Sequence, residues 1–196
     1  MNICKFFSSL FFVVELIVVC MAEDWPRFRG VNGQGISSQA VPTQWSEDKN
    51  IKWRCKLPGP GSSSPVIYRN KIFITSFSGV STGDQDPSKL VRHIVCVDKE
   101  KGTIIWKDTV KATQPEDPYS GFLVEHGYAS NTPLIDSGKL FVYLGKSGIH
   151  CYRLDGKKLW KKSLGTGSTR RKWGSAASPI IYRNTLIVSA AEESLT

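Results

Sequence analysis

The sequence predicts an all-β protein assembled from a repeated unit of short antiparallel strands. Three tryptophans, Trp53, Trp106 and Trp160, follow one another at intervals of 53 and 54 residues, each in similar apolar and basic surroundings. A period near fifty residues indicates a repeat architecture. The chain after residue 22 shows no sustained apolar period of about 3.6 residues, so no long amphipathic helix is expected.

The first half of each unit reads as a β-hairpin. A polar segment ends in proline and leads into two apolar strands, rich in β-branched and aromatic residues, that are joined by a short polar turn. The three copies occupy residues 63–74, 131–142 and 178–188.

The second half of the unit is present twice and consists of a third strand, a polar turn and the strand that carries the next tryptophan. The turns contain Asp98 and Gly102 in one copy and Asp155 and Gly156 in the other. These glycines supply the positive φ that such turns need. Four strands per unit predict a β-propeller blade. The tryptophans are expected to fill the wedge between neighbouring blades as structural core, not to stack on a ligand.

The two turn signatures, residues 98–106 and 154–160, resemble the repeat of PQQ-like β-propeller proteins. Three further stretches are similar to secreted bacterial members of that group: residues 24–35, 128–133 and 172–179. The resemblance covers nearly all of the chain from residue 24 and implies a propeller of four-stranded antiparallel blades. Because the third unit ends after its hairpin and propellers close with about 4–8 blades, we expect two to three blades of a longer protein.

Residues 1–22 have the pattern of a secretory signal peptide. Lys5 precedes an apolar run that ends at Cys20, and cleavage is expected after Ala22. A retained membrane anchor is the alternative, although the run is shorter than the roughly 20 residues that a span needs. The predicted organisation is a signal peptide (1–22), an N-terminal extended segment (23–50) and a partial propeller domain (51–196). Such a protein would be secreted or periplasmic in the cell envelope, with no transmembrane span after signal removal.

The charge and the cysteine content of the chain argue against nucleic-acid binding and against a cysteine-based metal site. The chain carries 26 Lys and Arg against 17 Asp and Glu, a net charge of +9, with its basic residues spread mainly over turns. A solvated basic surface is therefore expected, and no nucleic-acid-binding module is recognisable. After the signal peptide three cysteines remain, Cys55, Cys96 and Cys151. Cys96 and Cys151 occupy equivalent places in successive units, and we expect both to be small buried hydrophobes. No His/Cys spacing typical of a metal site occurs.

Two loops hold the candidate functional residues. One contains Glu125, His126 and Tyr128 at the end of a long polar segment, and the matching loop of the next unit contains Arg170, Arg171 and Trp173. Loops on a rigid scaffold commonly carry function, and equivalent loops of a propeller converge on one face. These six residues are therefore the candidate ligand or partner face. The alternative is a purely structural loop whose histidine packs on the neighbouring tyrosine.

The resemblance implies two classes of function. The first is a non-catalytic scaffold that binds a protein or ligand in the cell envelope, similar in this respect to the outer-membrane assembly lipoprotein of the same superfamily. The alternative is a dehydrogenase that uses PQQ and Ca²⁺, with its site mostly in blades outside this sequence. Many alcohol-oxidising quinoproteins carry two adjacent cysteines, and this sequence has no adjacent pair. No catalytic residue or metal ligand of that group can be matched here, so the scaffold function without a cofactor is expected.

Overall fold

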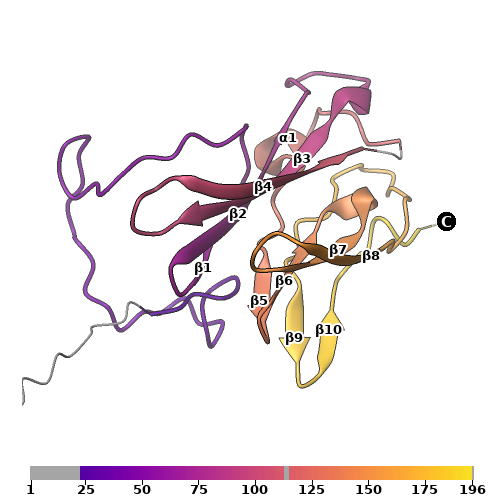
Figure 1. Cartoon of the computed structure of the whole chain (residues 1–196). Coiled ribbons are helices and arrows are strands. Elements are labelled where there is room, and N and C mark those ends of the chain that lie inside the picture. Colours follow the sequence, from indigo (N-terminus) through magenta and orange to yellow (C-terminus); the bar gives the residue numbers. More distant parts are fainter. Residues whose placement is uncertain (1–22, 113–114, 196) are drawn as a thin grey trace, which may run out of the picture.

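The computed structural model describes residues 23–112 and 115–195, and most of their regular structure is β-sheet. The predicted signal peptide, residues 1–22, lies outside the described residues. The strands form two four-stranded antiparallel sheets and one two-stranded hairpin (Figure 1). The predicted all-β fold of four-stranded antiparallel units is therefore confirmed.

Both four-stranded sheets are meanders in which each strand pairs with the next one along the chain. The first sheet, blade 1, consists of β1 (Val66–Tyr68), β2 (Lys71–Ser78), β3 (Val91–Asp98) and β4 (Ile104–Lys111). The second sheet, blade 2, consists of β5 (Leu134–Asp136), β6 (Lys139–Tyr143), β7 (Ile149–Arg153) and β8 (Lys158–Lys162). The third unit contributes the hairpin β9 (Ile180–Tyr182) and β10 (Thr185–Ile187).

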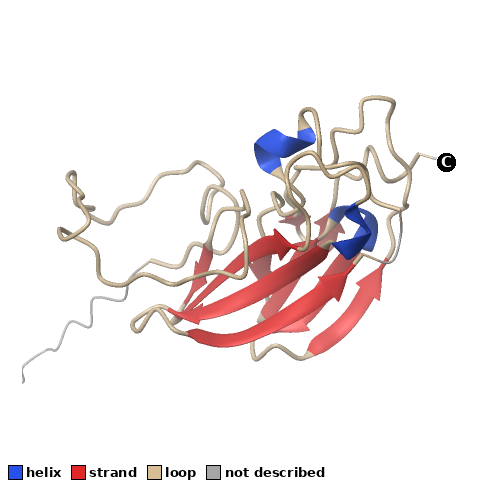
Figure 2. Ribbon diagram, turned by 90° about the horizontal axis from the view of Figure 1, so that it is seen from above, coloured by secondary structure: helices blue, strands red, loops and turns tan. Residues whose placement is uncertain are grey.

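The helical segments are short and lie among the loops, not on the sheets (Figure 2). They are two 3₁₀ turns, η1 (Pro87–Lys89) and η2 (Gly145–Ser147), and one helical turn, α1 (Leu123–His126). The helical turn α1 lies in a segment that the sequence predicts as loop. A single turn without an apolar period gives no sequence signal of its own.

The main core is packed between the facing surfaces of the two blades. Phe73 and Ile94 of blade 1 and Leu140 and Val142 of blade 2 belong to one cluster of fully buried side chains. Cys96 is in this cluster and Cys151 in the next one, so the prediction that both are buried hydrophobes is confirmed. Burial raises the pKa of the Cys96 thiol to about 11 and also raises that of Cys151.

Two of the repeat tryptophans contact the glycine turn of the following unit. The indole N–H of Trp53 donates to the carbonyl of Lys99 at 2.8 Å, and that of Trp106 donates to the carbonyl of Leu154 at 3.2 Å. A Cβ added at Gly102 would lie 2.4 Å from the Trp53 ring, and one at Gly156 would lie 2.9 Å from Trp106. The rings therefore lie directly on the turn backbones, and they couple each unit to the next.

The turn glycines and aspartates have the predicted local roles. Gly102 and Gly156 have φ of 67° and 95°, which favours glycine. Asp98 Oδ1 accepts the N–H groups of Glu100 and Lys101 at 2.9 and 2.8 Å, and Asp155 Oδ1 accepts that of Lys157 at 3.1 Å. These backbone hydrogen bonds hold the pKa of both carboxyls below its ordinary value.

The segments around the first and last repeat tryptophans differ from the segment around Trp106. Residues 51–57, around Trp53, form no strand, because this segment pairs with no other strand among the described residues. Trp160 lies 6.0 Å from Phe141 between ring centroids and beside the β9–β10 hairpin, but it is 41% exposed, and no glycine turn of a following unit covers it among the described residues.

The N-terminal segment is anchored at the first strands of both blades. Trp25 and Ile67 exchange two backbone hydrogen bonds of 2.8 Å each, and the carbonyl of Pro26 accepts the N–H of Ile135 at 2.7 Å. The rest of residues 23–50 makes turns and one isolated bridge between Ser46 and Lys49. The extended segment is therefore fixed to the sheets only near its start.

Candidate functional site

The two predicted loops meet through the imidazole of His126. Its Nε2 lies 2.7 Å from the carbonyl oxygen of Trp173, and its Nδ1 lies 3.0 Å from Ser130 Oγ. Because a carbonyl only accepts, Nε2 carries a proton and donates it to the Trp173 carbonyl. One side chain thus ties the α1 loop of blade 2 to the corresponding loop of the third unit.

Next to this tie, aromatic and cationic side chains reach the surface. The rings of Phe122 and Trp173 are 5.1 Å apart between centroids, and the Arg171 guanidinium lies 4.7 Å from the Trp173 ring centroid. Phe122 is 55% exposed and Trp173 is 40% exposed. We refer to Phe122, Arg171 and Trp173 as the aromatic–arginine patch.

The structure brings together part of the predicted face. His126, Arg171 and Trp173 lie in one group, and Glu125 and Arg170 are exposed on the same two loops. Tyr128 instead points inward, where its hydroxyl donates to the carbonyl of Asp117 at 2.5 Å. Burial raises the pKa of this tyrosine, so it remains protonated.

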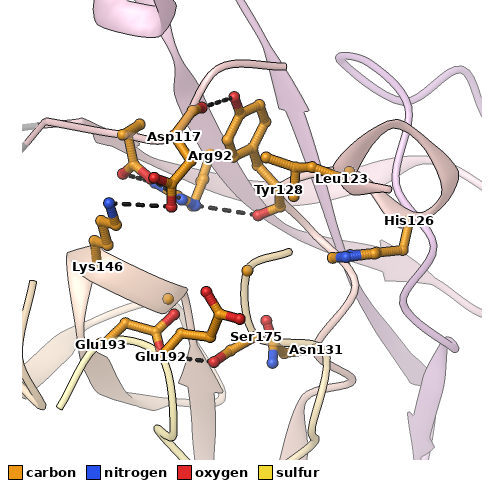
Figure 3. A pocket seen from close by; sticks show the side chains of 14 residues that line it. Arg92, Asp117, Leu123, His126, Tyr128, Asn131, Lys146, Ser175, Glu192 and Glu193 are labelled. Atoms are coloured by element: carbon orange, nitrogen blue, oxygen red, sulfur yellow. Dashed lines mark hydrogen bonds and ion pairs between the residues drawn. The ribbon is translucent and has the colours of Figure 1, made fainter. Parts of the chain in front are cut away.

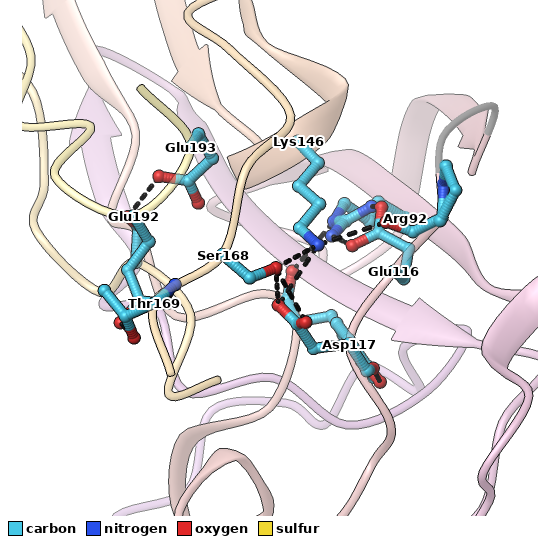
Figure 4. Close-up of polar contacts among 11 residues, drawn as sticks. Arg92, Glu116, Asp117, Lys146, Ser168, Thr169, Glu192 and Glu193 are labelled. Carbon is cyan, nitrogen blue, oxygen red and sulfur yellow. Dashed lines mark hydrogen bonds and ion pairs between the residues drawn. The ribbon is translucent and has the colours of Figure 1, made fainter. Parts of the chain in front are cut away.

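Beneath the loops lies a network of buried ion pairs (Figure 4). Arg92 of β3 makes two bonds of 2.7 and 2.9 Å to Glu116, and the two side chains are only 3% and 4% exposed. Lys146 of η2 lies 3.2 Å from Asp117, whose oxygens also accept from Ser168 at 2.7 and 2.9 Å. The network therefore links blade 1, blade 2 and the loop that leads into the third unit.

A small cavity of about 30 Å³ adjoins this network and is lined by His126, Arg92 and Lys146 together with two further carboxylates (Figure 3). Glu193 accepts from Ser175 Oγ at 2.5 Å, and Glu192 accepts from the Thr169 hydroxyl at 2.7 Å. A space of this size has room for about one water molecule. It is too small for an organic substrate.

Sequence reasoning missed the buried charges of the network. Arg92 lies on an apolar strand, and Glu116 and Asp117 are in a loop segment without a motif. Lys146 lies in a short turn between two strands, in a segment without a binding motif. The pairing joins residues far apart in the chain, and nothing in the local pattern indicates it.

The described residues do not fit a quinone–calcium centre. Ca²⁺ prefers several oxygen ligands, with carboxylates prominent among them. The buried carboxylates of Glu116 and Asp117 are neutralised by Arg92 and Lys146, so they are not available to a cation. Within residues 23–112 and 115–195, no group of three or more His, Cys, Asp or Glu side chains is placed to hold a metal ion.

The comparisons with known proteins agree with the fold. No helix in the part of the chain that the structure describes is long and apolar enough to cross a membrane. No curated protein matches the sequence. A family model described as outer membrane protein assembly factor BamB matches residues 80–196, which is more than half of the chain. The chain therefore belongs to this family of PQQ-like β-propeller proteins.

Proposed function

We propose that this protein is a non-catalytic binding scaffold of the cell envelope that holds a protein partner on its loop face. The family supports this assignment, because its description names an assembly factor of the outer membrane. The N-terminal pattern of Lys5, an apolar run and Ala22 supports export. The proposal assigns no cofactor to the protein.

The observation that carries the proposal is the aromatic–arginine patch. Tryptophan and arginine are enriched among the residues that dominate binding energy at protein interfaces. Phe122 and Trp173 expose apolar rings, and the exposed Arg171 places its guanidinium over the Trp173 ring. Exposed aromatic rings that are already ordered by their neighbours lose little conformational entropy on binding.

The charge around the patch suggests what kind of segment it binds. Arg170, Arg171 and Lys172 are consecutive and exposed. A partner segment with acidic residues beside an apolar side chain would complement both the rings and the basic run.

The buried groups below the patch fit a structural role better than a catalytic one. A catalytic acid or base needs a perturbed group in reach of a substrate. Arg92, Glu116, Lys146 and Asp117 are instead paired with one another in a space without room for an organic molecule. The pairs hold the loops in place, and the loops present the patch.

Site-specific photo-cross-linking in cells tests the proposal. A photoreactive amino acid replaces Glu125, which is exposed beside the patch, and in a second strain it replaces Tyr182, which is exposed on β9. We expect a discrete cross-linked protein from position 125 and none of the same mass from position 182. The adduct should disappear when Trp173→Ala is added, because the wild-type ring anchors the partner.

Trp173→Ala is a suitable variant because it leaves the loop connection intact. His126 donates to the backbone carbonyl of residue 173, not to its ring. Tyr182→Ala is the matched control, since Arg183 lies over that ring at 5.3 Å in a similar aromatic–arginine pair away from the patch. A cross-link that persists in Trp173→Ala, or that forms equally from both positions, would contradict the proposal.

A further inference from the structure

A second and larger cleft lies where the N-terminal loop meets the starts of the three units. Its volume is about 430 Å³, and its walls come from residues 27–29 and 32–33, from Ser62, from Ser130 and Thr132, and from residues 176–180. A volume of this order suits a small organic ligand. We refer to it as the first-strand cleft.

The repeat itself builds the floor of this cleft. The N–H of Ser64 donates to Thr132 Oγ1 at 3.0 Å, and the N–H of Thr132 donates to Ser178 Oγ at 2.9 Å. Each of these residues precedes the proline that opens a unit. The three units therefore present equivalent polar segments that are hydrogen-bonded to one another, and the hydroxyl groups of Ser62, Ser130, Thr132 and Ser178 line the cleft.

The cleft is cationic. Arg27, Arg29 and Asn32 line it together with serine and threonine side chains, and none of the described residues that line it is acidic. The Arg27 guanidinium is used within its own loop, where Nε donates to the carbonyl of Gly30 at 3.1 Å. No hydrogen bond joins the Arg29 guanidinium to any residue in the described part of the chain. The N–H donors of Arg29 therefore have no partner among the described residues.

The loop holds Arg29 in a strained conformation. Its φ is 62°, which an arginine adopts at a cost of about 1–2 kcal/mol. The carbonyl of Arg29 accepts the N–H of Gly35 at 2.8 Å, and Gly30 lies against the Trp25 ring so closely that a Cβ there would be 2.8 Å away. Strain of this kind persists where the surroundings enforce it, and it concentrates at ligand sites.

We propose that the first-strand cleft binds an oxyanion group, a phosphate or a carboxylate, of a small ligand through Arg29 and Asn32. Both side chains line the cleft, and a guanidinium and an amide supply N–H donors that match the oxygens of either group. The preset loop reduces the entropy lost on binding. This site is separate from the aromatic–arginine patch and does not depend on the scaffold function.

The test measures thermal unfolding of the protein with inorganic phosphate or acetate, against sodium chloride at equal ionic strength. A ligand that binds only the folded state raises the unfolding midpoint with its concentration. We expect at least one of the two anions to raise the midpoint of the wild type, and the responding anion identifies the preferred group. Arg29→Gly should weaken binding about tenfold or more, because a charge-assisted hydrogen bond is lost.

The Arg29→Gly variant has a close control. Glycine adopts the φ of residue 29 without strain, so the variant without added anion should be at least as stable as the wild type. Arg69→Gly removes another arginine with positive φ, 54°, from a turn outside the cleft. It should respond to the anion like the wild type. Equal responses of all three proteins would reveal only a general salt effect and overturn the proposal, as would a wild type that responds to neither anion.

Discussion

The contact between a turn glycine and a repeat tryptophan can be tested by one alanine substitution and a matched control. Gly102→Ala places a methyl group 2.4 Å from the Trp53 ring at a backbone φ of 67°. Gly138→Ala places the same group at a φ of 70° in the turn between β5 and β6, where nothing lies within 4 Å. Both changes strain the backbone equally, and only the first displaces the tryptophan.

The expected difference follows from what the indole of Trp53 loses. Alanine at positive φ costs about 1 kcal/mol at either site. At position 102 the ring must also move, so it gives up its 2.8 Å hydrogen bond to the Lys99 carbonyl. That bond is worth about 1 kcal/mol, and partial exposure of a half-buried tryptophan adds about 1–2 kcal/mol. We therefore expect Gly102→Ala to cost about 2–3 kcal/mol more than Gly138→Ala.

The assay is urea unfolding of the two variants and the wild type, followed by tryptophan fluorescence and circular dichroism. The free energies of unfolding should differ by the amount above, and the emission of folded Gly102→Ala should shift to the red because Trp53 becomes more exposed. Equal free energies for the two variants would refute the view that the tryptophan–turn contact couples the units.

Three further outcomes follow from the described contacts. Burial alone would raise the pKa of Asp108, but hydrogen bonds from Lys158 and Tyr152 hold this pKa below its ordinary value of 3.8. Asp108→Asn should therefore lower the free energy of unfolding by about 1 kcal/mol at neutral pH. Urea unfolding across pH should show this deficit vanish as the pH falls below 3.8, because the wild-type carboxylate then becomes protonated. Glu116→Gln should lower the free energy of unfolding by about 3 kcal/mol, because it leaves the buried charge of Arg92 without a counter-charge. Calorimetric titration of PQQ with Ca²⁺ should give no saturable heat, and stoichiometric binding with dye reduction by alcohols would contradict the absence of a cofactor.

Much of the fold is predictable from the sequence because the same hairpin pattern occurs three times along the chain. The hairpins β1–β2, β5–β6 and β9–β10 all begin within the predicted copies, and only β2 and β6 extend beyond their ends, to Ser78 and Tyr143. Their turns place Arg69, Ser137 and Arg183 at positive φ in equivalent positions. The segment around Trp53 forms no strand although its sequence resembles that around Trp106, because a strand also needs a neighbouring strand with which to pair.

The candidate site is less predictable, because it is built from loops that differ between units. Comparison of equivalent loops suggested that His126, Arg171 and Trp173 lie together, and the structure places them so. Phe122 was missed, since an isolated aromatic residue in a polar loop has no periodic partner. Tyr128 points inward because its hydroxyl donates to the carbonyl of Asp117. The sequence around Tyr128 does not indicate this hydrogen bond.

The most direct test of the scaffold function is the affinity of the partner that cross-links to position 125. Its dissociation constant is measured by calorimetry with the wild type, with Trp173→Ala and with the control Tyr182→Ala. Loss of an interface anchor costs about 2 kcal/mol or more, so Trp173→Ala should bind at least about tenfold more weakly while the control binds like the wild type. Equal affinities of all three proteins would contradict the assignment of the loop face as the binding surface.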